Sequence, residues 1–322
     1  MSTEHLTVAG FLSLRWSVEP EHPVLRPPFP SPVIADPTFR AAEESPDGRW
    51  HLFAHSILGI HHATSPDGLA WSRPAVVVRK AMRPFLYDEA GTFHLFYERI
   101  RPIGLLAPWL PLAWRSTIER RTSNDMNRWS APVEVLAPTE PWHQRASGGA
   151  AVGNPCLVRP ERGVCALYFS SSLVRLPDCG FDEPLHIGVA YAENMGGPYR
   201  LHPRPILSPR PDDPRCNLGA GSIKVIRLAD GFVGLQNGIY RDRATGHTGS
   251  AISVLKSADG IAWEYGHSAP ILAPTDGWRR SFIYACDARP RPDGTWVLYF
   301  NARDGWHWTR GREAIGRAIG RA

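Results

Sequence analysis

The sequence predicts an all-β fold, a five-bladed β-propeller that occupies the whole chain of 322 residues as a single domain. One hairpin pattern occurs five times along the chain. The first four copies are each followed by a second pair of strand-like runs. The last copy is one strand short, and an unpaired strand-like run lies at the N-terminus. Four-stranded units that repeat around a ring are typical of a propeller.

The first repeat has the clearest form. Val33 to Ser56 reads as two strand-like runs joined by Asp47-Gly48, and Asp-Gly favours the tight turn of a β-hairpin because glycine supplies a positive φ. The next segment, Gly59–Val78, contains a second Asp-Gly turn in SPDGLAW. The first repeat is therefore expected to be four antiparallel strands.

The later repeats follow the same order. Their expected inner hairpins are Met82–Glu98, Gly153–Ser170, Gly221–Asn237 and Cys286–Asn301, and their expected outer strands lie in Thr117–Leu136, His186–Leu207 and Gly249–Leu272. The fifth copy has one further strand, Glu313–Gly320, and the N-terminal run over 5–18 would complete it and close the ring. The expected blades are 33–80, 81–138, 147–208, 217–273 and 281–320.

The topology also places the long connections. In a four-stranded meander, the second-to-third turns and the crossings between blades lie on one face. These segments are the long ones here, including Arg99–Ser116, Ser171–Leu185 and Gly238–Thr248. Long loops on one rim of a domain are usually functional.

Two sets of polar residues are expected to meet at that face. Asp36, Arg83, Asn154, Ser222 and Asp287 begin the innermost strands, and His55, Glu98, Ser170, Asn237 and Asn301 end their hairpin partners. Polar residues at a solvated channel mouth need no function. A pocket that mixes carboxylates, an arginine, a histidine and amides is, however, typical of a site for a polyhydroxylated ligand.

Composition limits the other classes. The chain is 43% hydrophobic and 21% charged, and its net charge of +5 comes from scattered arginines, with only three lysines. No basic run accompanies the charge, so we expect no nucleic-acid binding. We expect no signal peptide and no membrane span, because neither pattern is visible. The five cysteines show no CxxC pair, which favours reduced thiols and a cytoplasmic location. No pattern indicates a metal or another cofactor.

At its first repeat the chain resembles a known group of enzymes. Ile34-Ala35-Asp36-Pro37, with the SPDG-x-x-W turn on the outer strands, resembles the five-bladed propellers of glycoside hydrolase families 43, 32, 62 and 68. The resemblance implies that Asp36 is the general base or nucleophile. A proline-led hairpin that ends in glutamate, Arg83-Pro84-Phe85 to Glu98, is also similar to the propeller domain of plant glucosamine inositolphosphorylceramide transferases.

The chain departs from the family pattern at two places. Asn154-Pro155 stands where family 43 has an aspartate and a proline, and Gly219-Ala220-Gly221-Ser222 replaces the expected glutamate of the fourth blade. Glycoside hydrolysis requires two carboxyl groups across the bond. We expect Asp36 and Glu98 to form this pair, with Glu98 as the acid because Phe96 and Tyr97 precede it. Asp287 would tune the pair or bind a hydroxyl.

Further residues are expected to contact the ligand. The predicted ligand-binding set is His55, Arg83, Asn154, Ser222, Asn237, Asn301, Arg303 and Trp306, where Arg303 and Trp306 belong to RDGWHWTRGRE and a tryptophan there would stack on a sugar ring. The apolar segment Pro102–Trp114 predicts a homodimer contact or a packed lid.

Two functions remain open from the sequence. The first is a glycosidase that acts in a pocket on the functional face, for which the retention of Asp36 together with Glu98 and Asp287 is the evidence. The second is a non-catalytic propeller that binds a carbohydrate or assists a glycosyltransferase or a biosynthetic pathway. The missing fourth-blade glutamate favours the second.

Overall fold

The computed structural model describes residues 6–101, 114–146 and 148–322. The apolar segment Pro102–Trp114, predicted to form a dimer contact, lies outside the described residues except for the backbone of Trp114. In the described part of the chain the strands form four antiparallel sheets, two of which gain single parallel pairings. No helix there is long and apolar enough to span a membrane.

The first two sheets come from the first two repeats. One has the order β2-β3-β4-β5, with β2 Ala35–Arg40, β3 Trp50–Ser56, β4 Gly59–Ser65 and β5 Ala75–Val78. The other contains β6 Ala81–Glu89, β7 Thr92–Arg101, β8 Trp114–Ser123, β9 Val133–Leu136 and the short β10 Gly149–Ala150. Both begin on the expected hairpins.

The third sheet has the order β11-β12-β13-β14, with β11 Val152–Val158, β12 Cys165–Leu176, β13 Phe181–Ala192 and β14 Arg200–Leu201. The segment Ser171–Leu185 was expected to be a loop, and this expectation is wrong. Strands β12 and β13 continue through most of it, with Leu173 opposite Pro184 and Val174 opposite Glu183. The turn tightens at Gly180, whose φ of 75° suits a residue without a side chain.

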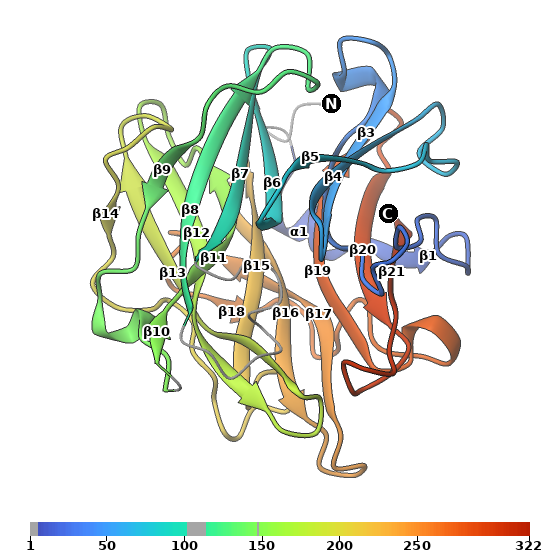
Figure 1. Cartoon of the computed structure of the whole chain (residues 1–322), viewed down its shortest axis with the longest axis vertical. Coiled ribbons are helices and arrows are strands. Elements are labelled where there is room, and N and C mark those ends of the chain that lie inside the picture. The colour runs from blue at the N-terminus through green and yellow to red at the C-terminus, as the bar shows by residue number, and fades with distance from the viewer. Residues whose placement is uncertain (1–5, 102–113, 147) are drawn as a thin grey trace.

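An eight-stranded sheet holds the remaining strands. It contains β15 Gly219–Leu228, β16 Gly231–Arg241, β17 Thr248–Ser257, β18 Glu264–Tyr265, β19 Phe282–Pro290, β20 Trp296–Arg303, β21 Glu313–Arg321 and β1 Arg15–Val18. Its two halves join at a single parallel pair, Ser250 with Phe282. Figure 1 shows β6, β11, β15 and β19 near the middle of the molecule, with β14 and β1 toward the outside.

The N-terminal run differs from the expected single strand over 5–18. It forms a short helix, α1 Val8–Leu12, before β1. Thr7 caps this helix, because the N–H of Gly10 donates to its hydroxyl at 3.1 Å. Phe11 is buried and packs edge-on against Trp296, with ring centroids 4.9 Å apart. Strand β1 pairs antiparallel with β21, from Arg15 opposite Arg321 to Val18 opposite Ala318.

Outer turns of the Ser-x-Asp-Gly type dock onto tyrosines of other sheets. In one, the N–H of Gly260 donates to Ser257 at 2.8 Å, and its carbonyl accepts from the Tyr168 hydroxyl of β12 at 3.0 Å. In the other, the Gly68 carbonyl accepts from the Tyr299 hydroxyl of β20. Both glycines have a positive φ. A side chain at either position would meet the tyrosine hydroxyl below 3.0 Å.

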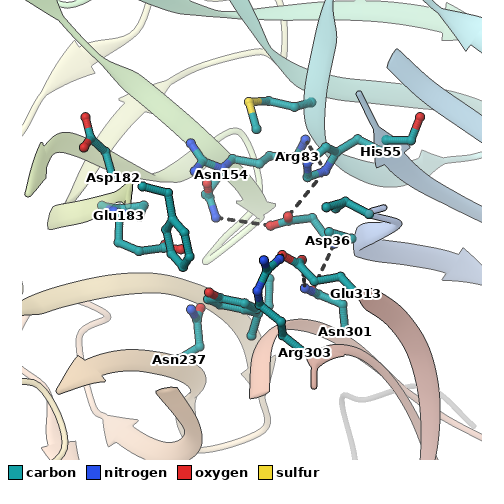
Figure 2. Close-up of a pocket in the computed structure, with 18 of the residues that line it drawn as sticks. Asp36, His55, Arg83, Asn154, Asp182, Glu183, Asn237, Asn301, Arg303 and Glu313 are labelled. Atoms are coloured by element: carbon teal, nitrogen blue, oxygen red, sulfur yellow. Dashed lines mark hydrogen bonds and ion pairs between the residues drawn. The ribbon is translucent and has the colours of Figure 1, made fainter. Parts of the chain in front are cut away.

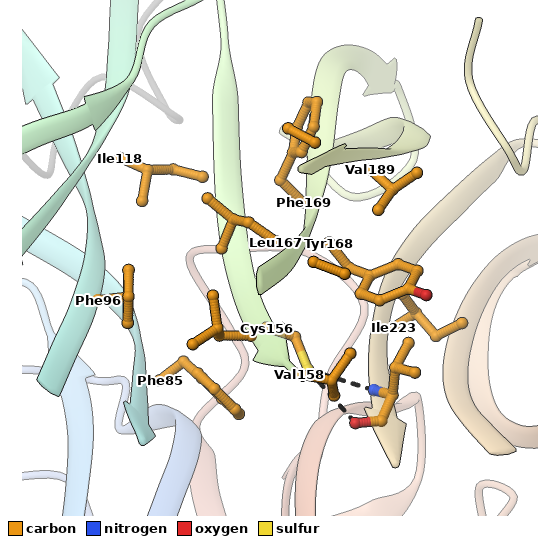
Figure 3. Packing of buried hydrophobic residues seen from close by; sticks show 14 of the residues in the cluster. Phe85, Phe96, Ile118, Cys156, Val158, Leu167, Tyr168, Phe169, Val189 and Ile223 are labelled. Carbon is orange, nitrogen blue, oxygen red and sulfur yellow. Dashed lines mark hydrogen bonds between the residues drawn. The ribbon is translucent and has the colours of Figure 1, made fainter. Parts of the chain in front are cut away.

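The core lies between neighbouring sheets. Figure 3 shows one part, where Phe85 and Phe96 approach Cys156 and Leu167. Each of these four side chains is buried, and burial of such groups supplies most of the favourable free energy of folding. All five cysteines are buried and unpaired by disulfides.

Short 3₁₀ helices occupy parts of the connections. They span Ala42–Glu44, Pro141–His143 and Gly277–Arg279.

Candidate active site

A pocket lies where the N-terminal ends of the innermost strands meet the C-terminal ends of their hairpin partners. Its empty space, including the open solvent at its mouth, is about 800 Å³. The polar residues that line it are Asp36, His55, Ser56, Arg83, Asn154, Asp182, Glu183, Asn237, Tyr284, Asn301, Arg303 and Glu313. Figure 2 labels all of these except Ser56 and Tyr284 and shows the labelled side chains converging from several strands.

Three of these side chains project from β-bulges. The strand register shifts between Ala35 and Thr38, between Met82 and Phe85, and between Gly153 and Cys156. The first bulged residues, Asp36, Arg83 and Asn154, have φ values of 53°, 54° and 48°.

A proline follows each of these residues, and proline lacks the N–H that a regular strand ladder requires. A bulge bends the strand and re-aims a side chain, so the polar-proline pairs direct these three groups into the pocket.

Asp36 lies near the middle of the pocket (Figure 2). Its Oδ1 lies 3.4 Å from Nδ2 of Asn154, and its own N–H donates to Asn301 at 3.1 Å. Burial raises the pKa of Asp36, while the positive charges of Arg83 and Lys224 act in the opposite direction. The net effect is a pKa of Asp36 above its ordinary value.

His55 contacts the same carboxyl without a charge of its own. Its Nδ1 lies 3.4 Å from Oδ2 of Asp36 and also receives the N–H of Arg83 at 3.3 Å. Burial lowers the pKa of His55 to about 3, and the neighbouring Arg83 and His61 add to the effect. The ring is neutral near pH 7, and a nitrogen that accepts from Arg83 has no proton to donate to Asp36.

Glu98, predicted as the acid, does not line this pocket. Its carboxylate accepts from Nη1 of Arg83 at 2.8 Å, and its side chain is 1% exposed. A Cβ on Gly153 would meet Oε2 of Glu98 at 1.9 Å, so the carboxylate is enclosed on that side as well. Burial lowers the pKa of Arg83, but the negative charges of Glu98 and Asp36 outweigh this effect and raise the pKa of Arg83 above its usual value. Glu98 is thus the partner of Arg83.

Glu183, which the sequence did not single out, does line the pocket. It lies on β13 opposite Val174, in the part of the hairpin that was expected to be a loop. Burial raises the pKa of Glu183 to about 8; Arg83 opposes this, and Glu313 and Asp36 add to it. A carboxyl with this pKa is protonated at pH 7. The signal in the sequence was Asp182-Glu183-Pro184, a polar pair before proline like the strand starts elsewhere.

Glu313 is a second pocket carboxylate that the sequence did not reveal. Its Oε1 accepts from Arg303 at 2.9 Å and its Oε2 from Asn301 at 3.1 Å. Burial raises the pKa of Glu313, and Arg303 opposes the shift. Arg303 also donates to the carbonyls of Gly305 and His307. Asn301 and Arg303 therefore line the pocket as predicted, with Glu313 as their common partner.

Asp287, Ser222 and Trp306 do not line the pocket. Asp287 accepts from Thr38 at 2.8 Å and pairs with Arg289 at 3.3 Å, deeper along β19. The strand position of Asp36 corresponds in β19 to the bulge between Ile283 and Cys286, which holds Tyr284.

The other two have partners elsewhere. Ser222 donates to Asn237 within its own hairpin, and Trp306 stacks on His247 with ring centroids 4.5 Å apart.

The acids of the pocket differ in their partners. Glu313 pairs with Arg303, and Asp182 pairs with Arg145 and Arg175. Among the described residues, no arginine or lysine forms an ion pair with Asp36 or Glu183. Burial raises the pKa of both carboxyls, and Arg83 opposes the shift at each of them.

Comparison with known proteins finds similarity in structure alone. No family model matches the sequence, and no curated protein is similar to it. A thermostable family-43 glycoside hydrolase has 13% identity and a TM-score of 0.60, over 88% of this chain and 89% of that chain. A family 117 glycoside hydrolase of the marine bacterium Zobellia galactanivorans has 14% identity and a TM-score of 0.61, over 96% and 91%.

An N-acetylgalactosamine deacetylase from F. plautii, solved with blood group B trisaccharide, has 13% identity and a TM-score of 0.63, over 95% of each chain. These likenesses cover nearly the whole chain. They establish that it has the all-β, propeller-type fold that these three proteins share.

Proposed function

We propose that the protein is a glycoside hydrolase that cleaves a glycosidic bond in the pocket, with Glu183 as general acid and Asp36 as general base or nucleophile. The observation that carries the proposal is the contrast between these two carboxyls. Burial keeps Glu183 protonated up to about pH 8; burial also raises the pKa of Asp36, but there a second cation, Lys224, joins Arg83 in opposing the shift. A pair of carboxyls with opposite protonation states is what glycoside hydrolysis requires.

In this reaction Glu183 would give its proton to the leaving-group oxygen as the glycosidic C–O bond breaks. Asp36 would either accept a proton from the attacking water or bond to the anomeric carbon itself, and in the second case water would later release the sugar. Asn154, Asn237 and Arg83 provide N–H donors for sugar hydroxyls. The fold of the structural neighbours supports a carbohydrate ligand.

We also propose that the sheets form five blades around a central channel. The eight-stranded sheet divides at the Ser250–Phe282 pair into β15 to β18 and a last blade of β19, β20, β21 and β1. The antiparallel pairing of β1 with β21 supports closure of the ring by the N-terminal strand.

The test is turnover of a glycoside library by Asp36→Asn and Glu183→Gln variants. Each substitution is expected to lower kcat by about 10²- to 10⁴-fold, the usual contribution of general acid-base catalysis. Substrates with good leaving groups need no proton, so they should restore part of the activity of Glu183→Gln but none of that of Asp36→Asn. Glu193→Gln is the matched control, since Glu193 is exposed one residue beyond β13.

Glu98→Gln separates the proposed acid from the one predicted by the sequence. It should lower activity equally for good and poor leaving groups, because Glu98 contacts Arg83 and not the pocket. If leaving-group rescue appears in Glu98→Gln and not in Glu183→Gln, our assignment is wrong. If the wild type binds sugars and hydrolyses none, the protein is a carbohydrate-binding propeller.

A further inference from the structure

Lys224 is a buried lysine of β15 that takes no chemical step in the proposed mechanism. It is 5% exposed and lines a second cavity, between the far ends of the innermost strands. Its ammonium lies 4.8 Å from the centre of the Phe85 ring of β6. Buried lysines usually have an ionic partner. In the described part of the chain, Lys224 forms no ion pair with a carboxylate.

The ammonium instead bonds to the backbone of a neighbouring bulge. Nζ of Lys224 donates to the carbonyl of Pro155 at 3.1 Å. Pro155 follows Asn154, whose amide lies 3.4 Å from Oδ1 of Asp36. Contacts therefore run from β15 through the β11 bulge to the carboxyl on β2, and the lysine supports the residue that orients Asp36.

The charge of Lys224 also acts on Asp36, after that of Arg83, in the direction that lowers the pKa of this carboxyl. Arg83 is bound by Glu98, so part of its field is cancelled. The other titratable neighbours of Asp36 add no cation: His55 is neutral, and Glu183 and Glu313 are acids. Asp287, the acid on β19 near Lys224, is already paired with Arg289. Lys224 is thus a cation that acts on Asp36 and that has no carboxylate partner among the residues the structure describes.

We propose that Lys224 is a positioning residue that holds Asp36 oriented and ionised, through its bond to the Pro155 carbonyl and through its unpaired charge. This inference rests on the proposed function, in which Asp36 acts as a carboxylate. A lysine reaching from the fourth repeat thereby completes a site whose base lies in the first.

The experiment is a carboxyl ¹³C NMR titration of the full chain labelled at aspartate, with the Asp36 signal assigned by its loss in Asp36→Asn. In Lys224→Met the Asp36 midpoint should move to higher pH, because a neighbouring cation favours the charged form. Lys224→Arg keeps the charge and should keep the midpoint near that of the wild type. Lys256→Met is the matched control, since Lys256 pairs with Glu264 at the surface of the same sheet.

Lys224→Gln guards against a folding defect, because it keeps a polar N–H donor at this position while the charge is lost. It should shift the midpoint as Lys224→Met does and should fold like the wild type. The acid limb of kcat/KM should move to higher pH in both neutral variants. An Asp36 midpoint in these variants equal to that in Lys256→Met would overturn the inference. The titration requires no turnover, so it decides the role of Lys224 even if no glycoside is hydrolysed.

Discussion

Glu183 should set the alkaline limit of activity. A general acid works in its protonated form, and the pKa of Glu183 is raised by burial to about 8. kcat/KM for substrates with poor leaving groups should therefore fall as the pH rises through about 8, because this parameter reports ionisation of the free enzyme. Rates measured from pH 5 to 10 check this. If the alkaline fall in kcat/KM persists unchanged in Glu183→Gln, another group is responsible for it.

The same residue should make stability depend on pH. A carboxyl whose pKa is higher in the folded protein than in the unfolded chain binds more protons when folded. The stability it confers is thus greatest below its ordinary pKa of 4.5 and is lost as the pH rises toward 8. Glu183→Gln removes this dependence.

The difference in Tm between Glu183→Gln and the wild type should therefore grow in favour of the variant from pH 5 to pH 8. Thermal unfolding at a series of pH values measures it. Glu193→Gln, at an exposed site, should show no such trend. A constant difference for Glu183→Gln would mean that Glu183 is not destabilised by its burial.

Among the elements, the β6–β7 hairpin contains a local conflict that can be relieved. Its two-residue turn is Ala90-Gly91, with φ values of 50° and 84°, as a type I′ turn requires. A left-handed conformation costs an ordinary residue roughly 1–2 kcal/mol, and glycine loses roughly 0.5–1 kcal/mol in extra chain entropy. Ala90→Gly should therefore stabilise the protein by about 0.5–1 kcal/mol.

Urea unfolding tests this as a higher midpoint with an unchanged slope. Ala131→Gly is a suitable control, because Ala131 is exposed and does not have a positive φ. It should lower the midpoint slightly, since it only adds freedom to the unfolded chain. A lower midpoint for Ala90→Gly would show that the turn tolerates alanine without strain.

The inner hairpins were predictable element by element, because Asp-Gly and polar-proline pairs mark their turns and starts. The length of the β12–β13 hairpin was not. Ser171–Leu185 contains proline, aspartate and glycine, which are typical of loops, yet cross-strand pairing continues to Leu176 and Phe181. Pairing with a partner strand thus overrode local preference. This extension carries Glu183, so the error in the element became an error in the site.

For the whole molecule, the buried thiols give a simple test of the folded state. Burial raises the pKa of Cys156 to about 11 and of Cys179 to about 12, and the reactive form of cysteine is the thiolate. A disulfide reagent at pH 8 should react slowly with the native protein and with five thiols once it is denatured. Fast reaction of any thiol in the native protein would contradict the burial of all five cysteines.

The sequence predicted the general arrangement better than the distances within it. The repeats located Asp36, Arg83 and Asn154 correctly, because a proline marks each bulge. The last two repeats have no such proline, and the strand register predicted there was wrong. Asp287 lies beyond the bulge of β19, and the side chain of Ser222 bonds to Asn237 within its own hairpin. Glu313 was missed because it begins the third strand of the last repeat, where only inner strands were expected to supply side chains.

The docking of the outer turns has a consequence for how the molecule unfolds. In stacked solenoid repeats, each unit contacts only its neighbours in a row, and terminal units can fray away. Here the turn after β4 is anchored by Tyr299 near the end of the chain, and the turn after β17 by Tyr168 of the sheet before it. Early and late parts of the sequence thus complete one another's turns. We expect cooperative loss of all the sheets in a single transition, in spite of a repetitive sequence.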